Sequence, residues 1–116
     1  MAWTEISQGT VVMDGTEKDI GAPGTAGGTF ILYLTDSATM AAGDRIELRV
    51  YITARTGATE RLLYGPSPGN VLVDVQEAPM WASIPVSLVS GGAVRYTAKQ
   101  TTGTNRTLTY VIISVT

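Results

Sequence analysis

Carboxylates are the side chains of this sequence that come nearest to a catalytic or metal-binding arrangement. A pair such as Glu47 and Glu60 has the residue types of a glycosidase acid and base. Both residues fall on strand-like segments beside arginines, however, which favours ion pairing across neighbouring strands. The acidic segment 14–19 (DGTEKD) is similar in composition to a calcium loop, but it lacks the further oxygen ligands and the glutamate in register that such a loop needs. We therefore expect no catalytic pair and no metal site.

Histidine and cysteine, which most often supply acid–base chemistry near neutral pH and nucleophilic attack, are both absent from the 116 residues. The sequence also contains no G-x-S-x-G elbow, no P-loop and no dinucleotide-binding fingerprint. Serine and lysine remain as nucleophiles, but nothing in the sequence places a base beside them. We predict a non-enzymatic protein that uses no cofactor.

Aromatic residues are better candidates for contacts with a partner. Tyr51 falls on the polar side of its strand, and Trp81 falls in the segment 78–81 (APMW), which we predict to be a loop. Trp3 lies near the N-terminus, where a tryptophan needs something to cover it. We predict that Trp3 and Ile6, together with Tyr51 and Trp81, contact a partner.

The elements that must position these residues are strands. Apolar residues recur with a spacing of two along nearly the whole sequence, which is the period of a β-strand. The segment 107–115 is apolar on both faces, so it either lies centrally in its sheet or packs against another subunit. Tyr96 and Tyr110 follow the apolar parity of their strands, which predicts that both lie in the core. The predicted strands span residues 4–13, 16–20, 28–35, 44–54, 59–64, 71–76, 84–89, 92–100 and 107–115.

Turn chemistry separates these segments. The pair Asp14-Gly15 is a strong signal for a tight hairpin between the first two strands. The segments 90–92 (SGG) and 102–105 (TGTN) are interpreted in the same way, the second as the turn of the last hairpin.

One segment departs from the strand pattern. Residues 35–44 contain a capping Asp36 or Ser37, several alanines and a closing glycine, which predicts at most one helical turn, anchored by Leu34 and Met40. About eight or nine short strands at this spacing are typical of a sandwich or barrel. We therefore predict that residues 1–116 form a single all-β domain, an antiparallel β-sandwich.

Charge and hydropathy exclude two classes of partner. Ten acidic and eight basic residues give a net charge of −2, and the lysines and arginines are scattered along the sequence. Nucleic-acid binding through phosphate contacts needs a concentrated basic patch, so we expect no nucleic-acid partner. The longest apolar runs, such as residues 30–34, are far too short to span a bilayer, so we expect no membrane partner.

Three segments together carry a resemblance to a known class of protein. They are the opening WTEI of residues 3–6, the cadence FILYL (30–34) followed by MAAGDRIELRV (40–50), and the ending KQTTGTNR of residues 99–106. They resemble small virion proteins of tailed bacteriophages, of the kind that decorate or cement the capsid. The resemblance implies a jelly-roll-like sandwich, usually a trimer, that sits on the outer capsid surface and binds the major capsid protein. It carries over no functional residue.

Residue patterns and resemblance lead to one main hypothesis for the function. We expect a non-enzymatic structural protein of a phage particle, located on the capsid surface, that stabilises the shell as a homo-oligomer through many modest contacts. The segment 2–7 is expected to contact a neighbour or the shell, and the last strand or its flanking loops to form the oligomer interface. The alternatives are a carbohydrate- or receptor-binding sandwich module and a phage tail or connector component.

Overall fold

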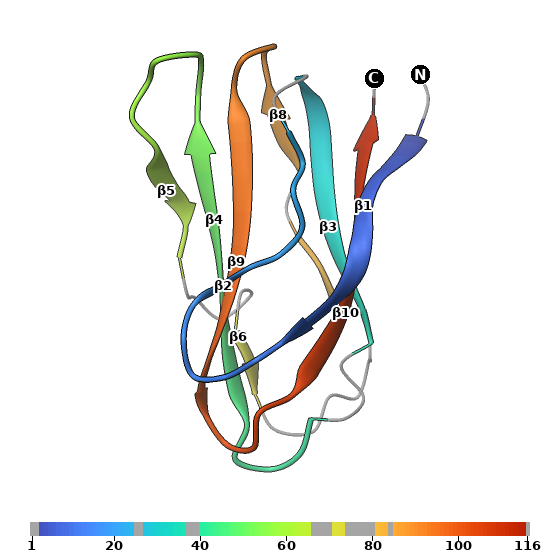
Figure 1. Cartoon of the computed structure of the whole chain (residues 1–116), viewed down its shortest axis with the longest axis vertical. Coiled ribbons are helices and arrows are strands. Elements are labelled where there is room, and N and C mark those ends of the chain that lie inside the picture. The colour runs from blue at the N-terminus through green and yellow to red at the C-terminus, as the bar shows by residue number, and fades with distance from the viewer. Residues whose placement is uncertain are drawn as a thin grey trace.

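The computed structural model describes residues 3–24, 27–36, 40–65, 71–73, 81–83 and 85–115. Within these ranges all regular structure is strand, and no helix is long and apolar enough to cross a membrane. The strands form two antiparallel sheets that pack face to face, so the predicted all-β sandwich is confirmed (Figure 1). The jelly-roll connection order remains a prediction. The strand bounds are β1 (Trp3–Val12), β2 (Lys18–Asp19), β3 (Gly28–Asp36), β4 (Arg45–Thr53), β5 (Arg61–Tyr64), β6 (Val71–Val73), β7 (Trp81–Ala82), β8 (Val86–Leu88), β9 (Ala93–Thr102) and β10 (Thr107–Val115).

The first sheet, called sheet A here, contains both ends of the described chain. Its order is β1-β10-β3, and the short strands β7 and β8 both pair with the other side of β3. The register of β1 against β10 shifts between Glu5 and Ser7, which makes Ile6 a β-bulge residue. Sheet A therefore has one long edge strand, β1, and an opposite edge made of two short pieces.

Sheet B has the order β2-β9-β4, with β5 and β6 sharing the far side of β4. Alternation along β4 explains its orientation. Ile46, Leu48 and Val50 are buried, whereas Arg45 is exposed and Arg49 half-buried. One face of the sheet is therefore apolar and the other charged, as the two-residue period predicts for an antiparallel sheet with one solvated side.

The sequence left open whether the last strand lies centrally in its sheet or packs against another subunit, and the structure shows that it lies centrally. β10 pairs with β1 on one side and with β3 on the other, so it lies centrally in sheet A. Leu108 and Ile112 point into the core and are fully buried, while Val111 and Ile113 are only half-buried on the opposite face. Both edges of β10 are thus occupied within the chain, and only its outer face is left for another subunit.

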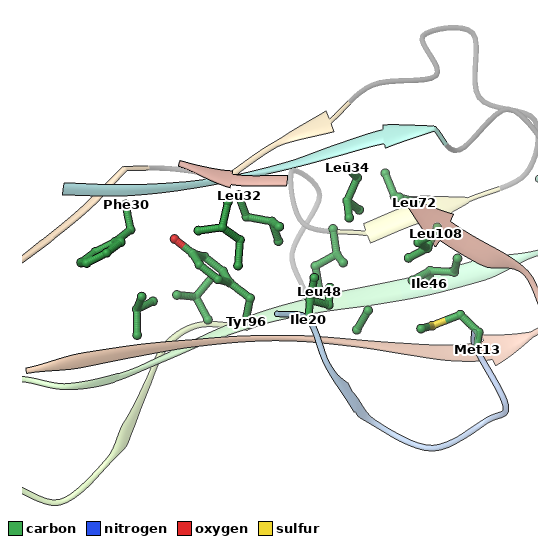
Figure 2. Packing of buried hydrophobic residues seen from close by; sticks show 14 of the residues in the cluster. Met13, Ile20, Phe30, Leu32, Leu34, Ile46, Leu48, Leu72, Tyr96 and Leu108 are labelled. Atoms are coloured by element: carbon green, nitrogen blue, oxygen red, sulfur yellow. The ribbon is translucent and has the colours of Figure 1, made fainter. Parts of the chain in front are cut away.

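The core lies between the two sheets and is dominated by apolar side chains (Figure 2). Tyr96 is the largest of the fully buried side chains, and Figure 2 shows its ring lying between the sheets, with the hydroxyl group toward the strand that carries Phe30 and Leu32. Tyr110 packs against the same cluster while remaining half-buried. The prediction that both tyrosines belong to the core is therefore confirmed.

A buried carboxylate ties one end of the sandwich together. The Asp44 carboxylate accepts hydrogen bonds from the Ala41 N–H (2.8 Å), the Thr104 N–H (3.0 Å) and the Arg106 Nε–H (2.7 Å). Its side chain is 1% exposed. The Ala41 N–H, followed by the Arg106 guanidinium, holds the pKa of Asp44 below its usual value. This one side chain links the turn before β4 to the connection between β9 and β10.

Three turns predicted as hairpins have a different role. The strands on either side of each turn lie in different sheets, because β1, β8 and β10 belong to sheet A while β2 and β9 belong to sheet B. The hairpin interpretation was therefore wrong at residues 14–15, 90–92 and 102–105. Turn chemistry reverses the chain direction, but the choice of pairing partner depends on which apolar face each strand must cover.

Two further local predictions need correction. Trp81 does not lie in a loop, since β7 pairs Trp81 with Leu34 of β3. Thr35 and Asp36 extend β3 instead of beginning a helical turn, because the pairing of β3 with β10 continues to Asp36. Residues 37–39 of the predicted turn lie outside the described residues. Leu34 and Met40, the expected anchors on either side of this segment, are both buried in the core.

Candidate binding surfaces

Arg95 is the centre of an ion-pair network on the outer face of sheet B, the face turned away from sheet A. Its guanidinium donates two hydrogen bonds to the Glu60 carboxylate (3.2 and 2.9 Å) and one to Asp19 (3.0 Å). The hydrogen bonds to Glu60, followed by the one to Asp19, raise the pKa of Arg95 above its usual value. Because all three side chains are at least 40% exposed, solvent screens the pairs strongly, and the network orients side chains more than it stabilises the fold.

Tyr51 lies beneath this network. The Arg95 guanidinium sits 4.3 Å from the centre of the Tyr51 ring, a cation–π contact. The Tyr51 hydroxyl donates to Glu17 (2.8 Å), which also accepts a hydrogen bond from the Thr97 hydroxyl (2.5 Å). The Thr97 hydrogen bond lowers the pKa of Glu17, while burial raises the pKa of Tyr51. Tyr51 is therefore held by the chain's own residues on one ring face and at its hydroxyl.

A shallow depression of about 280 Å³ opens beside Arg95. Its polar side chains are Asp19, Glu60 and Arg95, and the connection after β2 supplies an apolar wall that includes Pro23. The carboxylates can accept hydrogen bonds from a small polar ligand, but both already bind Arg95. Among the described residues no cluster of three or more carboxylates could hold a metal ion.

The outer face of sheet A has the opposite character. Its centre is apolar, because Val111 and Ile113 of β10 lie opposite Tyr33 and Ile31 of β3. Ile31 is only 9% exposed on this face. Threonine, serine and glutamine surround these residues, and Glu5 is the only charged residue among the side chains described on this face. Apart from Glu5, this face is uncharged among the described side chains, in contrast to the charged outer face of sheet B.

The structure does not bring the four sequence-predicted contact residues together. Ile6 and Trp81 are half-buried and pack against the core from sheet A, whereas Tyr51 lies on the outer face of sheet B. Trp3 is the first residue of β1, and its side chain lies outside the described residues. Their role as partner contacts stays a prediction, and Tyr51 and Trp81 do not share one platform.

Sequence reasoning predicted ion pairs in general but not the network around Arg95. Glu60 does pair with an arginine of another strand, as expected, while Glu47 pairs with Arg45 and Arg49 of its own strand (3.4 and 3.2 Å). Arg95 reaches partners 35 and 76 positions away in the sequence. The available signal was the run of outward-facing charged positions on β4 and β9, which marks the face but does not identify the partners.

Comparisons of the chain with protein-family models, with curated proteins and with solved structures find no match, so the functional argument rests on these surfaces.

Proposed function

We propose that this chain is a non-enzymatic structural protein that decorates a phage capsid and stabilises it by binding the major capsid protein as an oligomer. The observation that carries the proposal is the outer face of sheet A, which among the described side chains is uncharged apart from Glu5 and is centred on Val111, Ile113 and Tyr33. Charged residues are usually depleted at the centre of protein–protein interfaces, where aromatic residues are enriched. This face is therefore the surface that we assign to the shell.

The ionisable groups favour binding over acid–base catalysis. Every resolved pKa shift moves a group away from neutrality: the pKa of Asp14, Glu17 and Asp44 is lowered, and that of Tyr51 and Tyr96 is raised. A general acid or base works best when its pKa lies near the operating pH. None of these groups has that property.

The proposed mechanism is multivalent. Each subunit would bind through one modest patch, and subunits joined in an oligomer would engage neighbouring shell proteins together at high effective concentration. The charged face of sheet B would then point to solvent. Its ion pairs compensate part of this charge, although Arg45 and Arg49 share the carboxylate of Glu47 and one nitrogen of Arg49 has no hydrogen-bond partner among the described residues.

The test is sedimentation of the purified protein with empty phage shells. We expect the native chain to pellet with shells to a fixed stoichiometry and Val111→Lys to pellet at background level, because a lysine would be buried at the centre of the contact. Thr53→Lys is the matched control, since Thr53 is a half-buried strand residue of sheet B. It should bind like the native chain. Equal binding by both variants would contradict the assignment of the face.

A second candidate, a carbohydrate- or receptor-binding module, is favoured by one observation. The depression beside Arg95 presents two carboxylates, a residue type that binds sugar hydroxyls, and Arg95 itself stacks on the Tyr51 ring, a residue type that binds sugar rings. A glycan array would test it, with Tyr51→Ala as the variant that should lose binding. Rings or tubes in negative stain would instead favour a tail or connector component.

A further inference from the structure

The four sheet edges of the sandwich differ greatly in length. β1 is ten residues long, and in the part of the chain that the structure describes it pairs only with β10. The other edges consist of β2 with two residues, β7 and β8 with two and three, and β5 and β6 with four and three. β1 is thus the one long outermost strand among the described strands; at the other long edge the ten-residue β9 is interrupted by its pairing with β2 at Ala98 and Thr97.

Long edge strands normally carry features that block pairing with another chain, such as lysine, proline or inward-pointing charge. β1 has the sequence WTEISQGTVV, with no lysine, arginine or proline and with Glu5 as its only charged residue. Val12 at its end is 61% exposed. Glu5 and the bulge at Ile6 are its two features of the kind that discourage pairing. On either side of the bulge the free edge of β1 is suited to accept a strand.

We propose that β1 pairs antiparallel with β1 of a second copy of this chain, about a two-fold axis at Gln8. The two copies of sheet A would then form one continuous sheet across the dimer, with the same surface used on both sides. The pairing would supply the interface of the oligomer in the proposed function. Only the biological role of the dimer rests on that function, whereas the pairing itself is argued from β1. In the proposed register Gln8 lies opposite Gln8, Ser7 opposite Gly9, Glu5 opposite Thr10, Thr4 opposite Val11, and Trp3 opposite Val12.

The length of β1 and its bulge together select this register. Centring on Gln8 pairs every residue of β1 except Ile6, whereas a register centred on a neighbouring residue leaves one end of the strand unpaired. Residues that lie opposite each other in a sheet belong to the same face. Beyond the bulge, Gln8 and Thr10 share the outer face with Glu5, because they lie opposite Val111, Thr109 and Ile113 of β10. The pair Glu5–Thr10 therefore matches faces only if Ile6 is skipped, as it is skipped against β10. With that skip, the whole of β1 matches itself face for face.

Charge favours the same arrangement. Glu5 lies opposite the uncharged Thr10, so the two carboxylates of the dimer stay apart, whereas a register centred on Glu5 would place them opposite each other at a cost. A second copy is also the occupant that uses the full edge. Pairing of β1 with one of the other outermost strands would engage at most four residues, and pairing with β9 would be interrupted by β2.

A single engineered cysteine tests the axis directly, because the native chain contains none. Opposite residues of an antiparallel pair have Cα atoms about 4.5 or 5.5 Å apart, which a disulfide can bridge. We expect Gln8→Cys to form a covalent dimer under mild oxidation. Thr10→Cys is the matched control on the same strand, since Thr10 and its copy would be about 13 Å apart, too far for a disulfide. A mixture of Glu5→Cys and Thr10→Cys chains should form the mixed dimer.

Charge at the axis gives an independent test that does not require oxidation. Gln8→Lys and Gln8→Glu each place like charges opposite each other and should weaken the dimer by up to about fivefold in sedimentation equilibrium. An equal mixture of the two variants should restore it. Thr101→Lys, an exposed strand residue of sheet B, should leave the dimer unchanged.

The outcomes separate this inference from the proposed function. A monomer that forms no disulfide at position 8, or equal cross-linking at positions 8 and 10, would overturn the pairing of β1. A trimer without cross-linking at position 8 would also overturn it, yet shell binding could still be intact. A dimer cross-linked at position 8 that fails to pellet with shells would instead confirm the interface and contradict the proposed function.

Discussion

Tyr96 offers a substitution that should stabilise the protein. Its side chain lies between the two sheets and is 1% exposed, and its hydroxyl has no hydrogen bond of good geometry among the described residues. The nearby Ser83 hydroxyl counteracts the effect of burial on the Tyr96 pKa, but it already accepts a hydrogen bond from the Leu32 N–H (2.9 Å). Replacing Tyr96 by phenylalanine keeps the ring in the core and removes the poorly paired group.

The magnitude follows from the cost of an unpaired buried hydroxyl, about 1–3 kcal/mol. Part of that cost is offset in the native chain by the contact with Ser83. We therefore expect Tyr96→Phe to increase the free energy of unfolding by about 1 kcal/mol, the low end of that range. For a domain of this size the melting temperature should rise by about 4 °C.

Urea unfolding followed by tryptophan fluorescence measures this change. Tyr96→Ala is the control for packing: it removes the whole ring, leaves a cavity, and should decrease the free energy of unfolding by about 3–5 kcal/mol. The reasoning would be refuted if Tyr96→Phe decreased the free energy of unfolding by 1 kcal/mol or more. The hydroxyl would then have a strong partner.

Three further predictions concern pH and the Asp44 cluster. Burial raises the pKa of Tyr96 to about 12, above the value near 10 expected in the unfolded chain. Because the unfolded chain loses this proton first, the free energy of unfolding should fall by up to about 2.7 kcal/mol between pH 10 and 12. In urea titrations across this pH range, Tyr96→Phe should flatten that fall. The pKa of Asp44 is lowered in the folded chain. The contribution of this carboxylate to the free energy of unfolding is therefore complete above the unfolded pKa near 3.9 and is lost as the pH falls through the folded value. Asp44→Asn should weaken this acid dependence, measured by urea midpoints at a series of pH values. Gly103→Ala should cost more than about 1 kcal/mol in urea unfolding, because Gly103 has a φ of 93° and an added Cβ would overlap the Asp44 carboxylate.

The positions of the strands were predictable, because alternation is a local property. β4 shows this well: its buried Ile46 and Leu48 and its outward Arg49 follow directly from the two-residue period. The pairing of strands was not predictable from turns. Asp14-Gly15 connects two sheets, since β1 must cover the core from sheet A and β2 from sheet B. The apolar face that each strand covers, and therefore its pairing partner, depends on contacts between residues far apart in the sequence.

The sequence predicted which residues face outward but not which residues they contact. Tyr51 was predicted to face outward, and it does, but its contacts with Glu17 and Arg95 join residues from three separate segments. Trp81 was predicted to be a loop residue of the segment 78–81, yet a two-residue pairing with β3 brings it against the core. A strand of two residues is too short to show the alternation of apolar and polar residues that identifies longer strands.

Imaging of empty shells after incubation with an excess of the protein tests the central claim most directly. The account predicts ordered extra density at one repeated position of the shell, with the uncharged face of sheet A against the major capsid protein and the charged face of sheet B toward solvent. Bare shells after incubation, or density in which sheet B contacts the shell, would contradict it.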